Sequence, residues 1–214
     1  MKLVFFVIAV VAFFLKNDVA AAQTVEKTAV VFDSKLVHLL DSLHDEDQRW
    51  RNLLTKIRNG QADSSQLGEA RKMMRETDSL SHFHLKKIIE ERGFPNYDLV
   101  GEDGSHNFWL LMQHQDKYVF FQENVLDLMK IEVEKGKASG KDYAYLLDRV
   151  AVNSDKPQTF GTQMHLNADS SSYEPKPCLE PEKLNERRAS VGLGTIENYI
   201  ETMNQRYFGT LKKG

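Results

Sequence analysis

Apolar residues recur at three- and four-residue steps along most of the chain, which is the pattern of helices that bury one face. The first run spans Leu36–Ile57 and stops at Asn59-Gly60. The second spans about Gln66–Arg92 and stops at Gly93, a residue common after helix ends. The pattern predicts a mainly α-helical fold. Further helices are predicted over Val119–Val133, Tyr143–Val152, Pro181–Val191 and Thr195–Tyr207.

Some stretches between these runs lack helical periodicity. Residues 96–104 are predicted to form a loop, with Ser105 as the N-cap of a buried helix that follows. Ser139 and Asp142 have the spacing of a capping box. Prolines, serines and short alternating pieces after residue 153 predict a loop with a small β-hairpin near residues 158–178. We therefore expect a compact multi-helix single domain over residues 23–214.

The N-terminus has the composition of a secretion signal. Lys2 precedes the apolar run Leu3–Leu15, and Ala20-Ala21-Ala22 precedes Gln23. The run is shorter than the roughly 20 residues that a membrane-spanning helix needs. We therefore interpret residues 1–22 as a cleaved signal peptide and expect an exported protein, periplasmic or extracellular, without stable membrane insertion after cleavage. An uncleaved membrane anchor is the alternative.

Polar residues interrupt two helices that are otherwise apolar on nearly every side. The helix containing Phe108–Met112 carries Gln113, His114 and Asp116, and the helix Tyr143–Val152 carries Asp148 and Arg149. A buried polar group without a partner costs roughly 1–3 kcal/mol. Such residues must therefore pair with one another or bind a ligand. The turn that follows adds candidate ligand contacts: Gln158, Gly161, Thr162 and Gln163.

Asp47 falls on the apolar seam of the first helix, where the spacing predicts a hydrophobic residue. Arg51 lies one turn later on the same side, and Gln48 is adjacent. One interpretation is an i,i+4 ion pair on a partly exposed face. The other is that Asp47, Gln48 and Arg51 project into the polar site that the later helices also face.

His114 is the candidate general base, and Asp148 is the candidate carboxylate that would orient its ring. Such pairing requires the two side chains to be close in space, which the sequence does not establish. A single histidine on an apolar helix is also commonly a hydrogen-bonded core residue. Metal binding is not predicted, because His82 and His84 point in different directions on a helix and no His-x-x-x-His pair exists.

Charge and motif content narrow the possible functions. Of 28 basic and 31 acidic residues, signal cleavage would remove Lys2, Lys16 and Asp18 and leave a net charge of −4. With no basic cluster, this balance argues against a nucleic-acid partner. The single cysteine, Cys178, excludes an internal disulfide. The sequence has no Gly-x-Ser-x-Gly elbow, phosphate loop, dinucleotide fingerprint or zincin helix, so no cofactor is predicted.

The chain carries an ordered series of blocks: Asp47-Gln48-Arg49-Trp50-Arg51, Leu85 to Pro95, Val100-Gly101, Trp109 to His114, Asp116, Gln122, Ala144 to Val150, Asn153, Gln158 to Gln163 and Asn185 to Leu193. In these blocks and their order the chain resembles DUF6624, a family of uncharacterised bacterial proteins. The resemblance covers nearly the whole mature chain and implies a mainly helical single domain with no assigned function. Two departures are Phe160, where a tyrosine is expected, and His82, where an asparagine is expected. If a phenol hydroxyl took part in chemistry, the first departure would count against catalysis.

Two classes of function remain open at this stage. The first is an exported domain that binds a small ligand in a polar pocket between helices, with an unidentified small molecule or peptide as partner. A hydrolase is the more specific version of this class. In it, His114 and Asp148 are catalytic, and Arg51 and Arg149 contact an anion. The second is a non-catalytic interaction module in which the polar cluster is a buried hydrogen-bond network. Whether the protein is an enzyme is undecided by sequence. The other predicted ligand contacts are Asp47, Gln48, Gln113, Asp116, Gln158, Gly161, Thr162 and Gln163.

Overall fold

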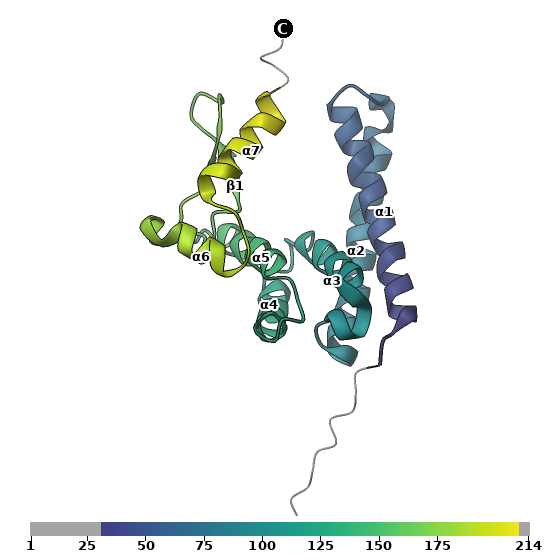
Figure 1. Cartoon of the computed structure of the whole chain (residues 1–214). Coiled ribbons are helices and arrows are strands. Elements are labelled where there is room, and N and C mark those ends of the chain that lie inside the picture. Colours follow the sequence, from purple (N-terminus) through teal and green to yellow (C-terminus); the bar gives the residue numbers. More distant parts are fainter. Residues whose placement is uncertain (1–30, 210–214) are drawn as a thin grey trace, which may run out of the picture.

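The computed structural model describes residues 31–209, which fold into helices and one short β-hairpin (Figure 1). The mainly α-helical prediction is confirmed, and so is the small hairpin. The predicted signal peptide lies outside the described residues. The elements in chain order are α1 (Ser34–Arg58), the short 3-10 helix Ser64–Gln66, α2 (Leu67–Arg92), α3 (Tyr97–Gln113), α4 (Val119–Glu134), α5 (Gly140–Asn153), β1 (Met164–Leu166), β2 (Tyr173–Pro175), the 3-10 helix Pro181–Lys183, α6 (Leu184–Ser190) and α7 (Ile196–Phe208).

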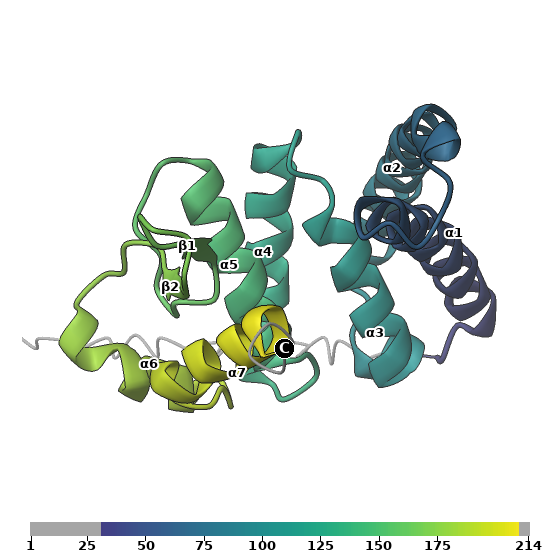
Figure 2. The same ribbon diagram turned by 90° about the horizontal axis from the view of Figure 1, so that it is seen from above.

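Helices α1 and α2 form a long antiparallel pair, and α3 packs against both of them (Figures 1 and 2). Asp33 caps α1, since its side chain accepts a hydrogen bond from the backbone N–H of Leu36. The apolar seams predicted from the sequence face inward here, with Leu40 and Leu85 fully buried. Burial of these faces is what holds helices of this length together, since helical propensity alone is marginal.

The prediction for residues 96–104 is wrong, because this stretch is helical. Asn96 accepts a hydrogen bond from the N–H of Leu99 and so caps α3 nine residues before the expected N-cap, Ser105. Gly101 has φ 74° and joins two helical pieces across a kink. Ser105 is therefore a buried residue within α3 and not its N-cap. The left-handed conformation is cheap for glycine, so one residue replaces the expected loop.

Helices α4 and α5 pack together in the second half of the molecule, where the β-hairpin, α6 and α7 follow (Figure 2). Ser139 caps α5 as predicted, accepting from the backbone N–H of Asp142. The strands β1 and β2 pair antiparallel, with Met164 opposite Pro175. Helix α7 contacts β2 of the hairpin.

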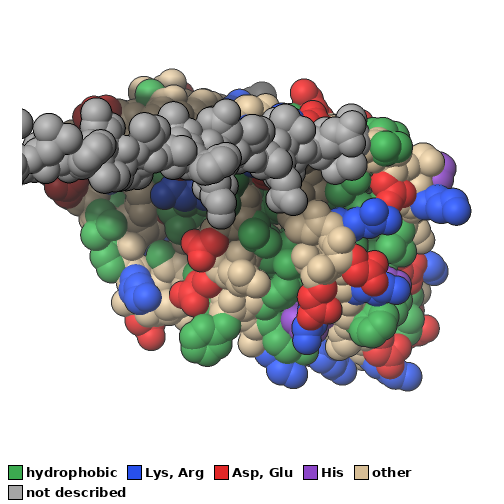
Figure 3. Space-filling view, turned by 90° about the horizontal axis from the view of Figure 1, so that it is seen from below, with side chains coloured by type: hydrophobic (Ala, Val, Ile, Leu, Met, Phe, Trp, Pro, Cys, Tyr) green, Lys and Arg blue, Asp and Glu red, His purple; other side chains and the backbone are tan. Residues whose placement is uncertain are grey.

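A continuous apolar core links α1 to α5, with Phe108, Met112 and Leu146 fully buried. The face seen in Figure 3 mixes acidic and basic side chains over the α1–α3 half, so it has no uniformly charged patch. Helix α2 carries two i,i+4 ion pairs on its exposed side, Lys86–Glu90 and Lys87–Glu91. None of the described helices is both long and apolar enough to cross a membrane.

Candidate functional site

The predicted site residues form two main polar groups and not one. The Asp47 cluster comprises Asp47, Gln48, Arg51 and His114 together with Asp78 on α2. The Asp148 network comprises Asp148 on α5 and the loop residues Gln158, Thr162 and Gln163. Asp47 therefore meets both Arg51 and His114, but no hydrogen bond or ion pair among the described residues joins His114 to Asp148.

The carboxylate of Asp47 is the centre of the first cluster, and its side chain is only 2% exposed. It accepts hydrogen bonds from Nε of Arg51 at 2.9 Å and from Nε2 of Gln48 at 2.9 Å. The ring Nδ1 of His114 lies 3.0 Å from the same carboxylate. Asp47 reaches the interior because its place on the α1 seam faces α3, and three partners compensate the cost of burying its charge.

Arg51 joins two helices through its guanidinium group. Its Nη2 donates to Oδ1 of Asp78 at 2.5 Å, and its Nη1 approaches the sulfur of Met74 at 3.6 Å. With Nε on Asp47, all three guanidinium nitrogens have a contact inside the protein. The i,i+4 pair predicted on α1 is thus present, and it is extended to a second carboxylate on α2.

The two carboxylates of this cluster have pKa values shifted in opposite directions. Burial raises the pKa of Asp47, but the hydrogen bonds and positive charges of His114 and Arg51 outweigh it, and the pKa is lowered. Burial and the nearby charge of Asp47 raise the pKa of Asp78, only partly offset by Arg51. Asp47 is therefore the carboxylate that the surroundings hold ionised.

His114 is the C-cap of α3, and this position directs its ring toward α1. Nδ1 faces Asp47, while Nε2 makes no hydrogen bond to any described residue. The side chain is 16% exposed. A carboxylate bound to one imidazole nitrogen fixes the tautomer and leaves the other nitrogen as a proton acceptor. Asp47, and not Asp148, is therefore the carboxylate that orients His114.

Asp148 is fully buried and holds the loop that follows α5. Its carboxylate accepts the backbone N–H groups of Thr159, Phe160 and Thr162 and the hydroxyl of Thr162, at 2.8–3.2 Å. These donors occupy both oxygen atoms. The predicted pairing of Asp148 with His114 is wrong, because the loop donors occupy this carboxylate and His114 contacts Asp47.

The amide side chains of the same loop also bond within the protein. Gln158 donates to the carbonyls of Gln163 and Lys176 and accepts the N–H of Gln163. Gln163 donates from its side chain to the hydroxyl of Thr162. Gly161, with φ +67°, allows the turn, and Arg188 donates to the carbonyl of Phe160. These bonds make the Asp148 network a closed set.

Asp116 and Arg149 form a third, more exposed contact between the α3–α4 turn and α5. The guanidinium Nε and Nη2 donate to the two oxygens of Asp116 at 2.7 and 2.6 Å, and Asn153 donates to the same carboxylate. Arg149 is thus paired with a carboxylate of the protein. Gln113 is buried near this turn, and its side chain makes no hydrogen bond to a described residue.

Sequence reasoning missed Asp78, although a signal for it existed. The inward side of α2 carries Thr77, Asp78 and Ser81 between the apolar positions Ala70 and Leu85. This is the same kind of interruption that singled out Asp47 on α1. Polar residues on the facing sides of two packed helices would have predicted a polar contact between α1 and α2.

A second histidine–carboxylate pair lies apart from the Asp47 cluster. Nδ1 of His106 on α3 lies 2.9 Å from Asp142 on α5, and the His106 side chain is 52% exposed. Its ring packs beside Trp109 at 4.9 Å. Asp47 has two further side-chain donors, Gln48 and Arg51, whereas His106 is the side chain that contacts Asp142. His106 therefore provides a matched comparison for His114.

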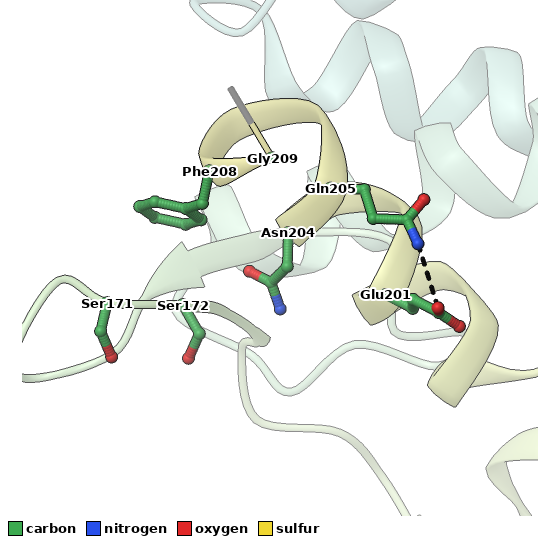
Figure 4. Close-up of a pocket in the computed structure, with 7 residues that line it drawn as sticks. All are labelled: Ser171, Ser172, Glu201, Asn204, Gln205, Phe208 and Gly209. Carbon is green, nitrogen blue, oxygen red and sulfur yellow. Dashed lines mark hydrogen bonds between the residues drawn. The ribbon is translucent and has the colours of Figure 1, made fainter. Parts of the chain in front are cut away.

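Metal-binding groups and surface hollows could mark a site around the candidate residues. Within residues 31–209, no group of three or more His, Cys, Asp and Glu side chains is placed to hold a metal ion. A surface hollow of about 470 Å³ lies between the hairpin and α7, and none of the predicted site residues lines it (Figure 4). Its lining residues are Ser171, Ser172, Glu201, Asn204, Gln205, Phe208 and Gly209.

Comparison with known proteins gave one match. The model of a family described as "Family of unknown function (DUF6624)" matches residues 35–212. Searches of curated proteins and of solved structures found no match. The match covers every described helix but for the first residue of α1, including both polar groups.

Proposed function

The chain belongs to DUF6624, a family of unknown function, and we propose that it is an exported protein that binds a small polar ligand beside His114 and hydrolyses it by general-base catalysis. The observation that carries this proposal is the contact of His114 Nδ1 with the buried Asp47 carboxylate, which leaves Nε2 without a described partner. An oriented imidazole with one free nitrogen is the usual general base of enzymes.

The reaction we propose uses water as the nucleophile. Nε2 of His114 takes a proton from a water molecule while the water oxygen bonds to an electrophilic carbon or phosphorus of the ligand. The bond to the leaving group then breaks, and the leaving group receives the proton from Nε2. Asp47 stays ionised throughout and stabilises the imidazolium, a role that suits its lowered pKa.

Of the other residues predicted to contact a ligand, we assign some to ligand binding and the others to holding the fold. We assign ligand binding to Gln48, whose amide contacts Asp47, and to Gln113, which precedes His114 and makes no side-chain hydrogen bond to a described residue. Arg51 positions Asp47. The Asp148 network fits the alternative class, in which polar residues form a structural hydrogen-bond network. Its donors and acceptors bond to one another within α5 and the loop that follows.

The test is a hydrolysis screen of the mature chain against nitrophenyl acetate, nitrophenyl phosphate, bis-nitrophenyl phosphate and amino-acid nitroanilides. His114→Asn retains an N–H that can donate to Asp47 but has no basic nitrogen. We expect it to lower turnover of the responsive substrate by roughly 10²- to 10⁴-fold. Asp47→Asn should lower turnover as well, since it removes the group that fixes the tautomer.

The matched control is His106→Asn, which removes the other described histidine with a close carboxylate on a neighbouring helix. It should leave turnover unchanged. Equal loss in the His106 and His114 variants, or full activity in His114→Asn, would refute the proposal.

Export has its own test. The apolar run Leu3–Leu15 and the alanines before Gln23 predict a mature N-terminus near Gln23. Mass spectrometry of the protein expressed in a bacterium should find this terminus in the exported fraction. Recovery of the intact Met1 form from the membrane fraction would contradict this part of the proposal.

A further inference from the structure

The charged groups around His114 do not cancel. Asp47 and Asp78 each bring one carboxylate, and Arg51 lies between them as the cation that both contact. With both carboxylates ionised, the cluster carries an excess of one negative charge. Arg51 links Asp78 to Asp47, and Asp47 contacts His114, so Asp78 belongs to the same cluster as the ring. An excess charge of this kind repels anions and attracts cations at short range.

Asp78 also has an oxygen available for a ligand. Its Oδ1 accepts from Arg51, whereas Oδ2 makes no hydrogen bond to any described residue. The side chain is 27% exposed, so a ligand can reach it. Asp47, by contrast, is buried and shared among three donors. Of the two carboxylates, Asp78 is the one that can contact a ligand directly.

Among the described residues, no Lys or Arg side chain other than Arg51 forms an ion pair with Asp47 or Asp78. Arg149 is paired with the carboxylate of Asp116. The ammonium of Lys117 lies 5.7 Å from the ring centroid of Tyr118. Arg51 contacts both Asp47 and Asp78, so its positive charge is already paired with two carboxylates of the protein. The geometry therefore does not favour the anion-binding role first expected for Arg51.

We propose that Asp78 sets the charge class of the ligand: the site takes neutral or cationic molecules, whose N–H or O–H group donates to Asp78 Oδ2, and it disfavours anions. This inference rests on the proposed function, because it places the ligand beside Nε2 of His114. Asp78 acts here as a specificity residue, distinct from Asp47, which orients the ring.

Two alkylating reagents of similar size and different charge provide the test. Iodoacetamide is neutral and iodoacetate is an anion. Each forms a bond from its carbon to an unprotonated imidazole nitrogen while iodide leaves. Mass spectrometry of the mature chain measures the rate at His114, and N-acetylhistidine gives the reference ratio of the two reagents. We expect iodoacetate to react about threefold more slowly at His114 than this ratio predicts, as one unit charge at about 7 Å in water gives.

Asp78→Asn should bring the two rates back to the reference ratio, because it removes the excess charge. The control is Asp45→Asn, which changes net charge equally at a side chain that is 83% exposed on α1. It should leave the ratio unchanged. Salt gives the same test in the unaltered protein, since raising ionic strength to about 1 M shortens the screening length to roughly 3 Å and should remove the difference.

The outcomes separate the two proposals. A reactive His114 with no charge preference, or with a preference that Asp78→Asn leaves intact, overturns the inference about Asp78 and leaves the general base in place. A His114 that reacts with neither reagent, while His106 reacts with both, overturns the proposed function and this inference with it.

Discussion

At the scale of single residues, buried carboxylates define the two polar groups and serve different ends. Asp148 accepts four donors from one loop and has both oxygen atoms occupied. Asp47 also has its oxygens occupied, but one of its partners is an imidazole whose other nitrogen is free. A closed set of bonds holds structure, whereas an oriented ring with a free nitrogen can transfer a proton.

Thermal melts of alanine variants separate these roles. Asp148→Ala leaves several buried donors without an acceptor, so we expect it to destabilise the fold by on the order of 3 kcal/mol. In a chain of this size, that lowers the melting temperature by roughly 6–12 °C. His114→Ala and Gln163→Ala should each cost about 1 kcal/mol or less, since their partners retain other bonds. Equal losses in all three variants would show that the whole polar set is structural.

The sequence predicted which polar residues are buried better than it predicted which of them pair. The interrupted apolar patterns placed Asp47, His114 and Asp148 at buried positions, and all three are buried or half-buried. It did not predict which carboxylate meets the imidazole, because pairing across helices depends on how α1 and α5 pack against α3. The spacing within one helix does not contain that information.

At the scale of elements, single glycines with positive φ mark where the chain departs from regular helix. Gly101 replaced an expected loop with a kink inside α3. Gly161 lets the loop after α5 turn back under Asp148, with φ +67°. The helices could be predicted because periodicity and capping depend on residues close in sequence. A kink at a single glycine interrupts the pattern as a loop would, so the sequence did not distinguish the two.

Gly161→Ala tests the contribution of this turn to stability. A Cβ at this position would lie 3.1 Å from Cδ1 of Ile196 and 3.3 Å from Cδ2 of Leu184, in a backbone conformation that costs an L-residue roughly 1–2 kcal/mol. The matched control is Gly60→Ala, which has φ +69° and no atom near the added Cβ. Denaturant titration should show a larger loss for Gly161→Ala than for Gly60→Ala. Equal losses would mean that α6 and α7 do not constrain the loop.

At the scale of the whole molecule, the α3–α4 turn is where the two halves meet. His114 bonds to α1 on one side of this turn, and Asp116 bonds to α5 on the other. Gln115 between them donates to the backbone carbonyl of Asp78 on α2. Polar contacts at this junction therefore tie together helices that are far apart in sequence, and their charge state should affect global stability.

Acid should weaken the fold partly through Asp47. Its pKa is lowered in the folded state from an ordinary value of 3.8, so its contribution to stability is present above about pH 4 and is lost as pH falls through the folded value. Asp116 has a lowered pKa for a similar reason: burial raises it, and Arg149 outweighs burial. Asp78 and Asp142, whose pKa values burial raises, change stability in the opposite direction.

Asp47→Asn isolates this contribution. The variant should be less stable than the unaltered protein at pH 7 and should lose less stability between about pH 5 and pH 3. Urea titrations across this range measure both quantities. Parallel pH profiles for the two proteins would indicate that Asp47 is not ionised by its surroundings in the way that the geometry implies.

The tautomer of His114 is the most direct measure of the central claim, that Asp47 orients this ring for proton transfer. Nitrogen-15 NMR of the histidine side chains distinguishes a protonated ring nitrogen from an unprotonated one, and His114→Asn assigns the signal. At a pH where the ring is neutral, we expect the proton on Nδ1, facing Asp47, and an unprotonated Nε2. In Asp47→Asn this preference should be lost. A proton on Nε2 in the unaltered protein, or a tautomer that does not respond to Asp47→Asn, would contradict the account.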